Sequence, residues 1–150
     1  MKIFTKPCPI YNYDIDLASH VTNSTYIRWL DEMREQMLIE CGLPLTEILK
    51  RGFLAILLRT EIHYKQGLFY GDDVMLQSGC KIISPVRMQF VHEFKRRING
   101  GAGFDEIVSS ANQDAIFVKQ GTHRPVKIFD EILKAVENTD YILSPREENK

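Results

Sequence analysis

The sequence predicts an α+β domain in which one long helix packs against an antiparallel sheet of five strands. Three observations favour this fold class. One stretch has the spacing of an amphipathic helix, later stretches alternate as strands do, and those strands follow one another through short turns. At 150 residues, the chain has the length of one ordinary domain. We expect that domain over residues 1–143 and a mobile tail over residues 144–150.

The expected elements begin with a strand over residues 4–13 and continue with the long helix over residues 24–41. Its apolar residues recur every three or four positions, which places them on one side of a helix. Asn23 or Ser24 can cap its start, and Gly42 can end it in a left-handed conformation. A shorter helix is expected over residues 46–51. The apolar side of the long helix consists of Tyr26, Trp29, Leu30, Met33, Met37 and Cys41.

From residue 54 the apolar period changes to two, which is typical of strands. The first of these strands, LAILLRTEIHYK, places Leu54, Ile56, Leu58, Thr60, Ile62 and Tyr64 on one face. Further strands are expected over residues 73–84, 86–98 and 106–119. Asn99 and Gly100 predict a two-residue hairpin turn, because both residue types tolerate positive φ. A short extended piece and a closing helix over residues 127–137 complete the chain.

Composition excludes several classes of function. The formal net charge of −1 provides no general attraction to nucleic acid or to an anionic membrane. Cys8, Cys41 and Cys80 are odd in number and far apart, which argues against disulfides and a zinc ribbon. No stretch is long and apolar enough for a signal peptide or a membrane span. We therefore expect a cytoplasmic protein that binds neither nucleic acid nor membrane.

The stretch YDIDLASHVTNSTY, residues 13–26, gathers two acids, a histidine and an asparagine directly before the long helix. A carboxylate can attack a carbonyl group or activate water, and backbone donors can face a developing oxyanion. Asp16 can supply the carboxylate, and the free N–H groups around residues 22–25 can supply the donors. Alone, an aspartate before a helix is most often a turn former.

The surrounding pattern changes that reading. The segment DLASHVTNSTYIRWLDEMR, residues 16–34, resembles the signature of the 4-hydroxybenzoyl-CoA thioesterase-like family of acyl-CoA thioesterases. The segments IHYKQGLFYGDDVMLQS and ANQDAIFVKQ are similar to later blocks of that family. The resemblance and the order of elements imply a hotdog fold, in which the sheet wraps the long helix. Thr22 and Ser19 depart from the asparagine and glycine that many members have.

The resemblance implies that Asp16 is the catalytic carboxylate, acting as base or nucleophile, in a site at a dimer interface. Asp14 is expected on the same face of an extended chain, but only Asp16 has the family's spacing to Tyr26. His20 is expected to be a hydrogen-bonding residue rather than a proton shuttle, and Asn23 to cap the helix, contact substrate or do both. The expected substrate-binding residues are His20, Val21, Thr22, Asn23, Tyr26 and Tyr64.

Coenzyme A brings phosphates, and a chain without net positive charge must meet them locally. Lys65 resembles the family's basic residue after the strand tyrosine, and Arg87 is a second candidate from its place at a strand start. Lys95, Arg96 and Arg97 are expected to be solvated. Glu61 and His63 share a strand face without a third ligand, so we expect no metal and no cofactor.

The predicted function is hydrolysis of a fatty or aromatic acyl-CoA by a homodimer or homotetramer, since an open edge strand favours pairing with a second copy. Two alternatives stay open. The substrate could be carried by acyl carrier protein, or the chain could bind acyl ligands without catalysis. A hotdog hydratase fits less well, because such enzymes place aspartate and histidine five apart, whereas Asp16 and His20 are four apart.

Overall fold

The computed structural model describes residues 2–98 and 101–137. The expected hairpin turn at residues 99–100 and the expected tail lie outside the described residues, as does the proposed domain boundary at residue 143. In chain order the elements are β1 (Phe4–Pro7), the 3-10 helix η1 (Asn12–Asp14), α1 (Asn23–Glu40), α2 (Leu45–Lys50), β2 (Phe53–Tyr64), β3 (Val74–Ile82), β4 (Arg87–Arg96), β5 (Glu106–Lys119), β6 (Pro125–Val126) and α3 (Asp130–Glu137).

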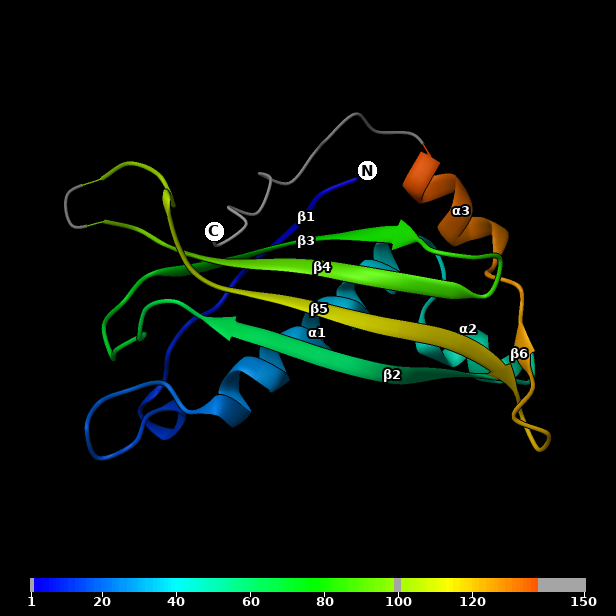
Figure 1. Cartoon of the computed structure of the whole chain (residues 1–150), viewed down its shortest axis with the longest axis horizontal. Helices are drawn as coiled ribbons and strands as arrows, with labels where there is room; N and C mark the ends of the chain where they lie inside the picture. The colour runs from blue at the N-terminus through cyan, green and yellow to red at the C-terminus, as the bar shows by residue number, and fades with distance from the viewer. Residues whose placement is uncertain (1, 99–100, 138–150) are drawn as a thin grey trace, which may run out of the picture.

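The strands form one antiparallel sheet with the order β1-β3-β4-β5-β2, and β6 pairs with β5. Figure 1 shows α1 behind the sheet. The predicted packing of one long helix against an antiparallel sheet is therefore confirmed. The short extended piece expected before the closing helix is the two-residue strand β6, which adds a sixth strand to the five expected.

The apolar side of α1 packs against the sheet. Trp29, Leu30 and Met33 are at most 1% exposed, and the Phe94 ring of β4 lies 5.3 Å from the Tyr26 ring. Each fully buried side chain of this size contributes about 1.5–3 kcal/mol to stability. The helix therefore stays on the sheet through its apolar side, and its polar flanks remain available at the surface.

The ends of α1 differ slightly from expectation. The helix begins at Asn23, so the cap position belongs to Thr22 rather than to Asn23 or Ser24, and no side-chain hydrogen bond caps it. Gly42 follows the helix with φ of 76°. This left-handed conformation, which glycine adopts at little cost, confirms the predicted stop.

The first strand ends earlier than the sequence predicts. β1 stops at Pro7, and residues 12–14 form the 3-10 helix η1 instead of extended chain. Pro7 and Pro9 cannot donate to a strand ladder because proline has no backbone N–H. This shortening turns the chain away from the sheet just before the acidic residues of the opening motif.

The alternation predicted for β2 is interrupted in the middle of the strand. The register with β5 shifts between Leu57 and Arg59, so Leu58 is an extra residue in a β-bulge. Leu57 and Thr60 lie opposite Ala115 and Gln113 of β5, on the face toward α1. The prediction of one uniform apolar face is therefore wrong. The extra residue in the bulge shifts the alternation by one, so odd-numbered residues before the bulge and even-numbered residues after it lie on the same face.

A buried chain of hydrogen bonds crosses the helix-facing side of the sheet. Gln113 Oε1 accepts from Arg34 Nη1 at 2.6 Å, and His92 Nε2 lies 3.0 Å from the same oxygen. Arginine only donates, which fixes the orientation of the Gln113 amide, so His92 donates through Nε2 and accepts from Ser78 through Nδ1 at 2.6 Å. Gln113 Nε2 donates to Thr60 at 3.0 Å. The chain joins α1 to four neighbouring strands.

The buried imidazole makes stability depend on pH. Burial lowers the pKa of His92 from 6.5 to about 3. As pH falls below about 6.5, His92 becomes protonated in the unfolded chain but stays neutral in the folded chain. The folded state therefore has its full stability above that pH and loses stability as pH falls. Between pH 6.5 and 5 we expect the free energy of unfolding to fall by up to about 1.4 kcal/mol per pH unit more in the wild type than in His92→Gln. Urea unfolding at several pH values measures this difference; equal slopes would contradict it.

Candidate active site

Asp16 sits in a tight turn that its own side chain stabilises. Asp16 Oδ1 accepts hydrogen bonds from the backbone N–H groups of Ala18 at 2.9 Å and His20 at 3.0 Å. No described residue donates to the other oxygen, and the side chain is exposed. The carboxylate is therefore held in place through one oxygen while the other faces solvent, which suits a reacting group.

The same turn explains one departure from the family pattern. Ser19 has φ of 65°, the left-handed conformation in which glycine is favoured. Its N–H donates to the Asp16 carbonyl at 3.0 Å, and its carbonyl accepts from Tyr70 at 3.1 Å. Serine thus adopts the backbone of a glycine position, and the turn keeps its hydrogen bonds.

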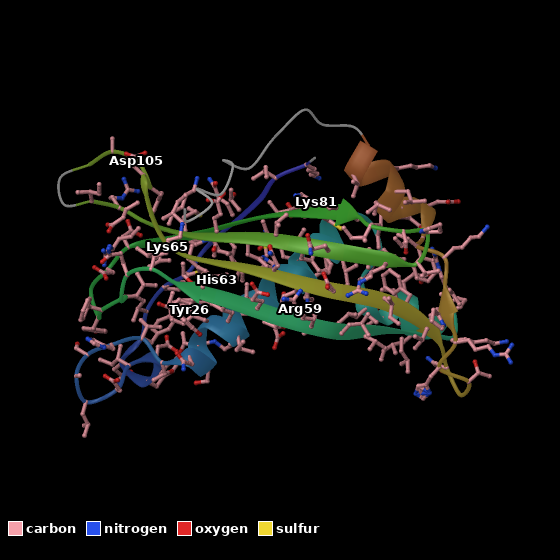
Figure 2. All side chains as sticks on the ribbon, viewed as in Figure 1. Tyr26, Arg59, His63, Lys65, Lys81 and Asp105 are labelled. Carbon is pink, nitrogen blue, oxygen red and sulfur yellow. The ribbon has the colours of Figure 1, made fainter. Side chains whose placement is uncertain are left out.

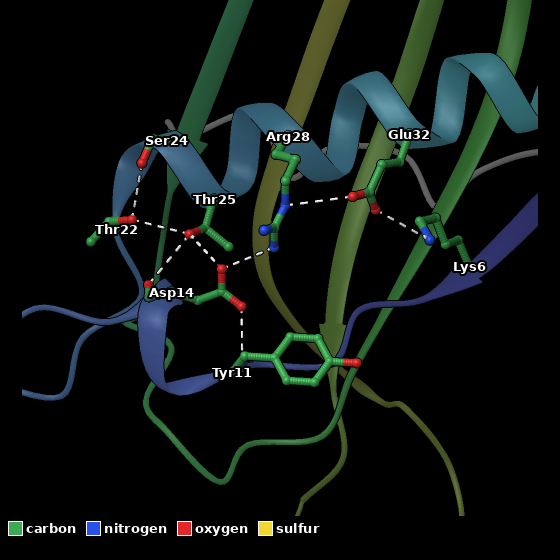
Figure 3. Close-up of polar contacts among 8 residues, drawn as sticks. All are labelled: Lys6, Tyr11, Asp14, Thr22, Ser24, Thr25, Arg28 and Glu32. Carbon is green, nitrogen blue, oxygen red and sulfur yellow. Dashed lines mark hydrogen bonds and ion pairs between the residues drawn. The ribbon is translucent and has the colours of Figure 1, made fainter.

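Asp14 has a different environment from Asp16, although only one residue separates them. It is 1% exposed, and Figure 3 shows its carboxylate between the Tyr11 N–H, at 2.9 Å, and the Arg28 guanidinium, also at 2.9 Å. Thr25 Oγ1 donates from 3.3 Å. The expectation that Asp14 shares a face with Asp16 is wrong, because the 3-10 helix turns Asp14 inward.

Two further residues extend this network to the sheet. Glu32 lies 3.5 Å from Arg28 and 3.3 Å from Lys6 of β1. Figure 3 shows the resulting line of alternating charges beneath α1. The start of the helix, the turn before it and the edge strand are thereby fixed relative to one another.

The start of α1 presents unused donors. The Thr22 hydroxyl bonds to the Ser24 and Thr25 hydroxyls at 3.1 and 3.0 Å, and no described residue accepts from the backbone N–H groups of Asn23 and Ser24. Such groups carry the positive end of the helix dipole. They can bind an oxyanion that forms in front of the helix.

A pocket of about 190 Å³ opens at this helix start. The loop after β2 closes it, since Val21 N–H donates to the Leu68 carbonyl at 2.8 Å and the His20 ring packs edge-on against Phe69 at 4.6 Å. Asp16 lies next to the pocket, because its carboxylate accepts a hydrogen bond from the backbone N–H of His20, which lines the pocket. The lining residues are His20, Val21, Asn23, Tyr26, Tyr64, Lys65, Gln66, Gly67 and Leu68.

The pocket contains five of the six predicted substrate-binding residues; Thr22 does not line it. Tyr26 and Tyr64 meet edge to face at 5.1 Å between ring centroids. Burial, with a further contribution from Tyr64, raises the pKa of Tyr26 to about 12. Both tyrosines are therefore neutral near pH 7 and provide aromatic surface with a hydroxyl donor.

The two predicted CoA-binding residues lie far apart. Lys65 lines the pocket, exposed and without an acidic partner among the described residues. Arg87 of β4 lies opposite Ile116 of β5, which in turn lies opposite Ile56 of β2. Along β2, Ile56 is roughly 25 Å from Tyr64 of the pocket. Arg87 also donates to Asp114 at 2.7 Å. Figure 2 shows Lys65 near Tyr26 at one end of the sheet.

Arg96 is a positioning residue that sequence reasoning did not find. It donates to the Gly67 carbonyl at 3.0 Å and pairs with Asp72 and Glu106, so the expectation that it is solvated is wrong. The hydrogen bond from Arg96 lowers the pKa of Glu106. Arg96 holds the loop that supplies Gln66, Gly67 and Leu68 to the pocket, and only Gly67, a glycine after a strand, hinted at that loop in the sequence.

Other nucleophile and metal chemistry receives little support. Burial raises the pKa of Cys8 and Cys80 to about 12, so neither thiol ionises near neutral pH. Glu61 and His63 form a hydrogen-bonded pair on the outer face, and the described ranges contain no group of three metal-ligating side chains. Among residues 2–98 and 101–137, no helix is long and apolar enough to cross a membrane.

Comparison with known proteins decides the family, because residues 12–136 match the family described as the thioesterase-like superfamily. The chain belongs to this superfamily. A relative from Aquifex aeolicus (strain VF5), which carries a provisional name as an esterase, is 28% identical over 127 residues, covering 84% of this chain and 91% of the relative.

Two solved thioesterases have the same fold. The 1,4-dihydroxy-2-naphthoyl-CoA thioesterase from Synechocystis superposes with a TM-score of 0.82 at 18% identity, covering 94% of this chain and all of that chain. The 4-hydroxybenzoyl-CoA thioesterase from Pseudomonas sp. strain CBS-3 gives 0.78 at 22% identity, covering 90% and 99%. The predicted hotdog fold is confirmed.

The buried Asp14 carboxylate should be required for stability. Asp14→Asn keeps the volume but removes the buried carboxylate that pairs with Arg28 and leaves Arg28 only its longer ion pair with Glu32, so we expect a loss of about 1–3 kcal/mol in the free energy of unfolding. Urea denaturation followed by circular dichroism measures it. Glu47→Gln, which breaks an exposed ion pair on α2, is the control and should change stability by less than about 1 kcal/mol. Equal effects in the two variants would refute a special role for Asp14.

Proposed function

We propose that this superfamily member hydrolyses an acyl-CoA thioester to a free acid and coenzyme A, in the cytoplasm. The observation that carries the proposal is the Asp16 carboxylate, exposed and held by its turn beside a pocket that begins at unused helix-start N–H groups. A carboxylate and oxyanion donors on one short stretch of chain are the two requirements of thioester hydrolysis.

The roles of the residues follow from this geometry. The N–H groups of Asn23 and Ser24 stabilise the oxyanion that develops on the thioester carbonyl oxygen. Asp16 either attacks the carbonyl carbon to form an anhydride that water then hydrolyses, or takes a proton from water that attacks the carbonyl directly. On both routes the thiolate of coenzyme A leaves and the free acid is formed. Tyr26 and Tyr64 pack against the acyl group. Both solved thioesterases above are named for aromatic acyl groups, which favours an aromatic acyl group here.

Lys65 is the candidate contact for coenzyme A, since this exposed residue lines the pocket and has no acidic partner among the described residues. The described bases nearby are less available, because Arg96 and Arg97 form ion pairs with Asp72 and Asp73. One unpaired cation suits a small phosphate-bearing carrier better than the broad acidic surface of a carrier protein. We therefore favour acyl-CoA over acyl carrier protein.

We further propose a homodimer through β2, with a dimer of dimers as the larger candidate. β2 is an edge strand of 12 residues whose outer edge pairs with no described strand. Arg59 and Glu61 flank Thr60 on this strand. Antiparallel pairing about a two-fold axis at Thr60 sets each Arg59 opposite the Glu61 of the partner subunit. The pocket beside Tyr64 then adjoins the second copy.

Replacement of Asp16 tests the catalytic assignment. In Asp16→Asn the amide oxygen can still accept the two turn hydrogen bonds, so the fold should persist while the reactive carboxylate is lost. We expect kcat to fall by about 10²-fold to 10⁴-fold. Steady-state hydrolysis of benzoyl-CoA and short fatty acyl-CoAs measures it, with Asp73→Asn as an exposed control. Turnover of Asp16→Asn close to wild type would refute the assignment, and no hydrolysis by the wild type would favour a binding protein.

The carrier is tested by Lys65→Glu. Beside a phosphate the reversed charge repels, so KM for acyl-CoA should rise more than KM for an acyl-N-acetylcysteamine, which lacks the nucleotide. Solvent screening limits such exposed pairs to about 0.2–1 kcal/mol, and the effect should shrink as salt is added. Lys119→Glu, at the other end of the sheet, is the matched control. Equal, salt-insensitive losses on both substrates would exclude a phosphate contact.

The dimer is tested by sedimentation equilibrium at micromolar concentration. The expected mass is twice or four times the chain mass of 17.4 kDa. Arg59→Glu should shift the equilibrium toward monomer, because it places like charges opposite each other. A wild type that sediments as a single chain would contradict the proposal.

A further inference from the structure

Three side chains stand in a row across the turn that contains Asp16. Ile15 and Val21 form an antiparallel bridge. The next pair toward the tip of the turn is Asp16 and His20, and the Asp16 N–H donates to the His20 carbonyl at 2.9 Å. His20 also forms an antiparallel bridge with Phe69. Side chains of directly opposite residues share one face of such a pair, with β-carbons about 4.5–5.5 Å apart, so the His20 imidazole lies between the Asp16 carboxylate and the Phe69 ring.

The imidazole is positioned by packing, and its nitrogens are unused. Its ring packs edge-on against Phe69 at 4.6 Å between centroids, and the side chain is exposed and lines the pocket. Among residues 2–98 and 101–137, none forms a hydrogen bond with either ring nitrogen of His20. Histidine is the side chain that most often transfers protons in enzyme sites. An imidazole in this place can therefore accept a proton from a water molecule in the pocket.

Attack by Asp16 on the thioester creates a need for a second proton acceptor. Once one Asp16 oxygen has bonded to the carbonyl carbon and the thiolate has left, the aspartate is part of a mixed anhydride. It can then no longer deprotonate the water that hydrolyses this anhydride, so another side chain has to do so. Asp14 cannot take this role, because it is buried and both of its oxygens are engaged.

The other titratable side chains of the pocket are poor acceptors. Burial raises the pKa of Tyr26 to about 12 and also raises the pKa of Tyr64, so both phenols keep their protons near pH 7. A lysine ammonium group, as in Lys65, has donors but no acceptor. His20 is thus the remaining titratable group among the pocket-lining residues, and it lies directly opposite the residue that would carry the acyl group.

We propose that His20 is a second catalytic residue, which takes a proton from the water that hydrolyses an acyl–Asp16 anhydride. This inference rests on the proposed thioesterase function and commits it to one of its two routes. In the first step Asp16 bonds to the acyl carbon, and the C–S bond breaks to release the thiolate. In the second step the water oxygen bonds to the acyl carbon, one water proton moves to His20, and the Asp16 carboxylate leaves with the electron pair of the C–O bond. The imidazolium then gives its proton to the thiolate, so that one thioester and one water yield one acid and one thiol.

The test resolves the two steps in His20→Gln, which keeps the backbone N–H that Asp16 binds but has no basic nitrogen. The substrate is the one that wild type hydrolyses fastest among benzoyl-CoA, acetyl-CoA and hexanoyl-CoA, and stopped flow follows the released thiol. We expect a burst close to one coenzyme A per subunit, followed by steady turnover about 10²-fold to 10⁴-fold below wild type. His123→Asn, which replaces an exposed histidine beside Lys119 at the other end of the sheet, should turn over like wild type.

Two further readouts exclude a merely structural role for His20. Mass spectrometry of quenched His20→Gln should find the Asp16 peptide heavier by one acyl group. Hydroxylamine attacks anhydrides without a general base, so it should restore turnover in His20→Gln but not in Asp16→Asn. His20→Phe keeps a ring against Phe69 and should show the same burst and adduct, so it carries the test if His20→Gln does not fold.

The outcomes separate this inference from the proposed function. Turnover of both His20 variants within a few-fold of wild type would overturn the role of His20 and leave the thioesterase in place. Slow turnover without a burst and without an acyl adduct would do the same, because the defect would then precede release of the thiol. A wild type that hydrolyses none of the three substrates would refute the proposed function, and the role of His20 with it.

Discussion

The candidate site depends on one buried carboxylate. Asp14 binds the N–H of Tyr11 before it and the side chains of Thr25 and Arg28 on α1, so a single group joins the incoming turn to the helix. Because Asp14 is buried, loss of any of these partners destabilises the fold, since a buried charge without partners is costly. The turn that contains Asp16 begins directly after Asp14. The hydrogen bonds of Asp14 therefore fix the position of that turn in front of the helix.

Environment divides two similar residues between two roles. Asp14 is enclosed and its carboxylate has partners at both oxygens, whereas Asp16 is exposed and uses one oxygen to shape its own turn. A carboxylate whose oxygens are all engaged has none left to act as base or nucleophile, whereas an exposed carboxylate held through one oxygen keeps the other free for either role. The loop after β2, held by Arg96, completes the pocket from the other side.

Local patterns predicted those parts of the molecule that depend on neighbours in sequence. The existence and approximate extent of β5 and the long helix follow from local sequence signals, and three of the four residues of the HVTN motif line the pocket. Features set by distant partners could not be predicted this way. The inward turn of Asp14 depends on Arg28, the role of Arg96 depends on the loop near Gly67, and the bulge at Leu58 depends on pairing with β5.

Chemical rescue tests the central claim, that Asp16 reacts while Asp14 supports, most directly. Each aspartate is replaced by alanine in a separate variant, and thioester hydrolysis is measured as formate is added. Formate is a small carboxylate that can enter an exposed gap but cannot rebuild a buried network. Formate should restore turnover in Asp16→Ala and leave Asp14→Ala unchanged. Rescue of Asp14→Ala, or turnover in Asp16→Ala that equals wild type without formate, would contradict the account.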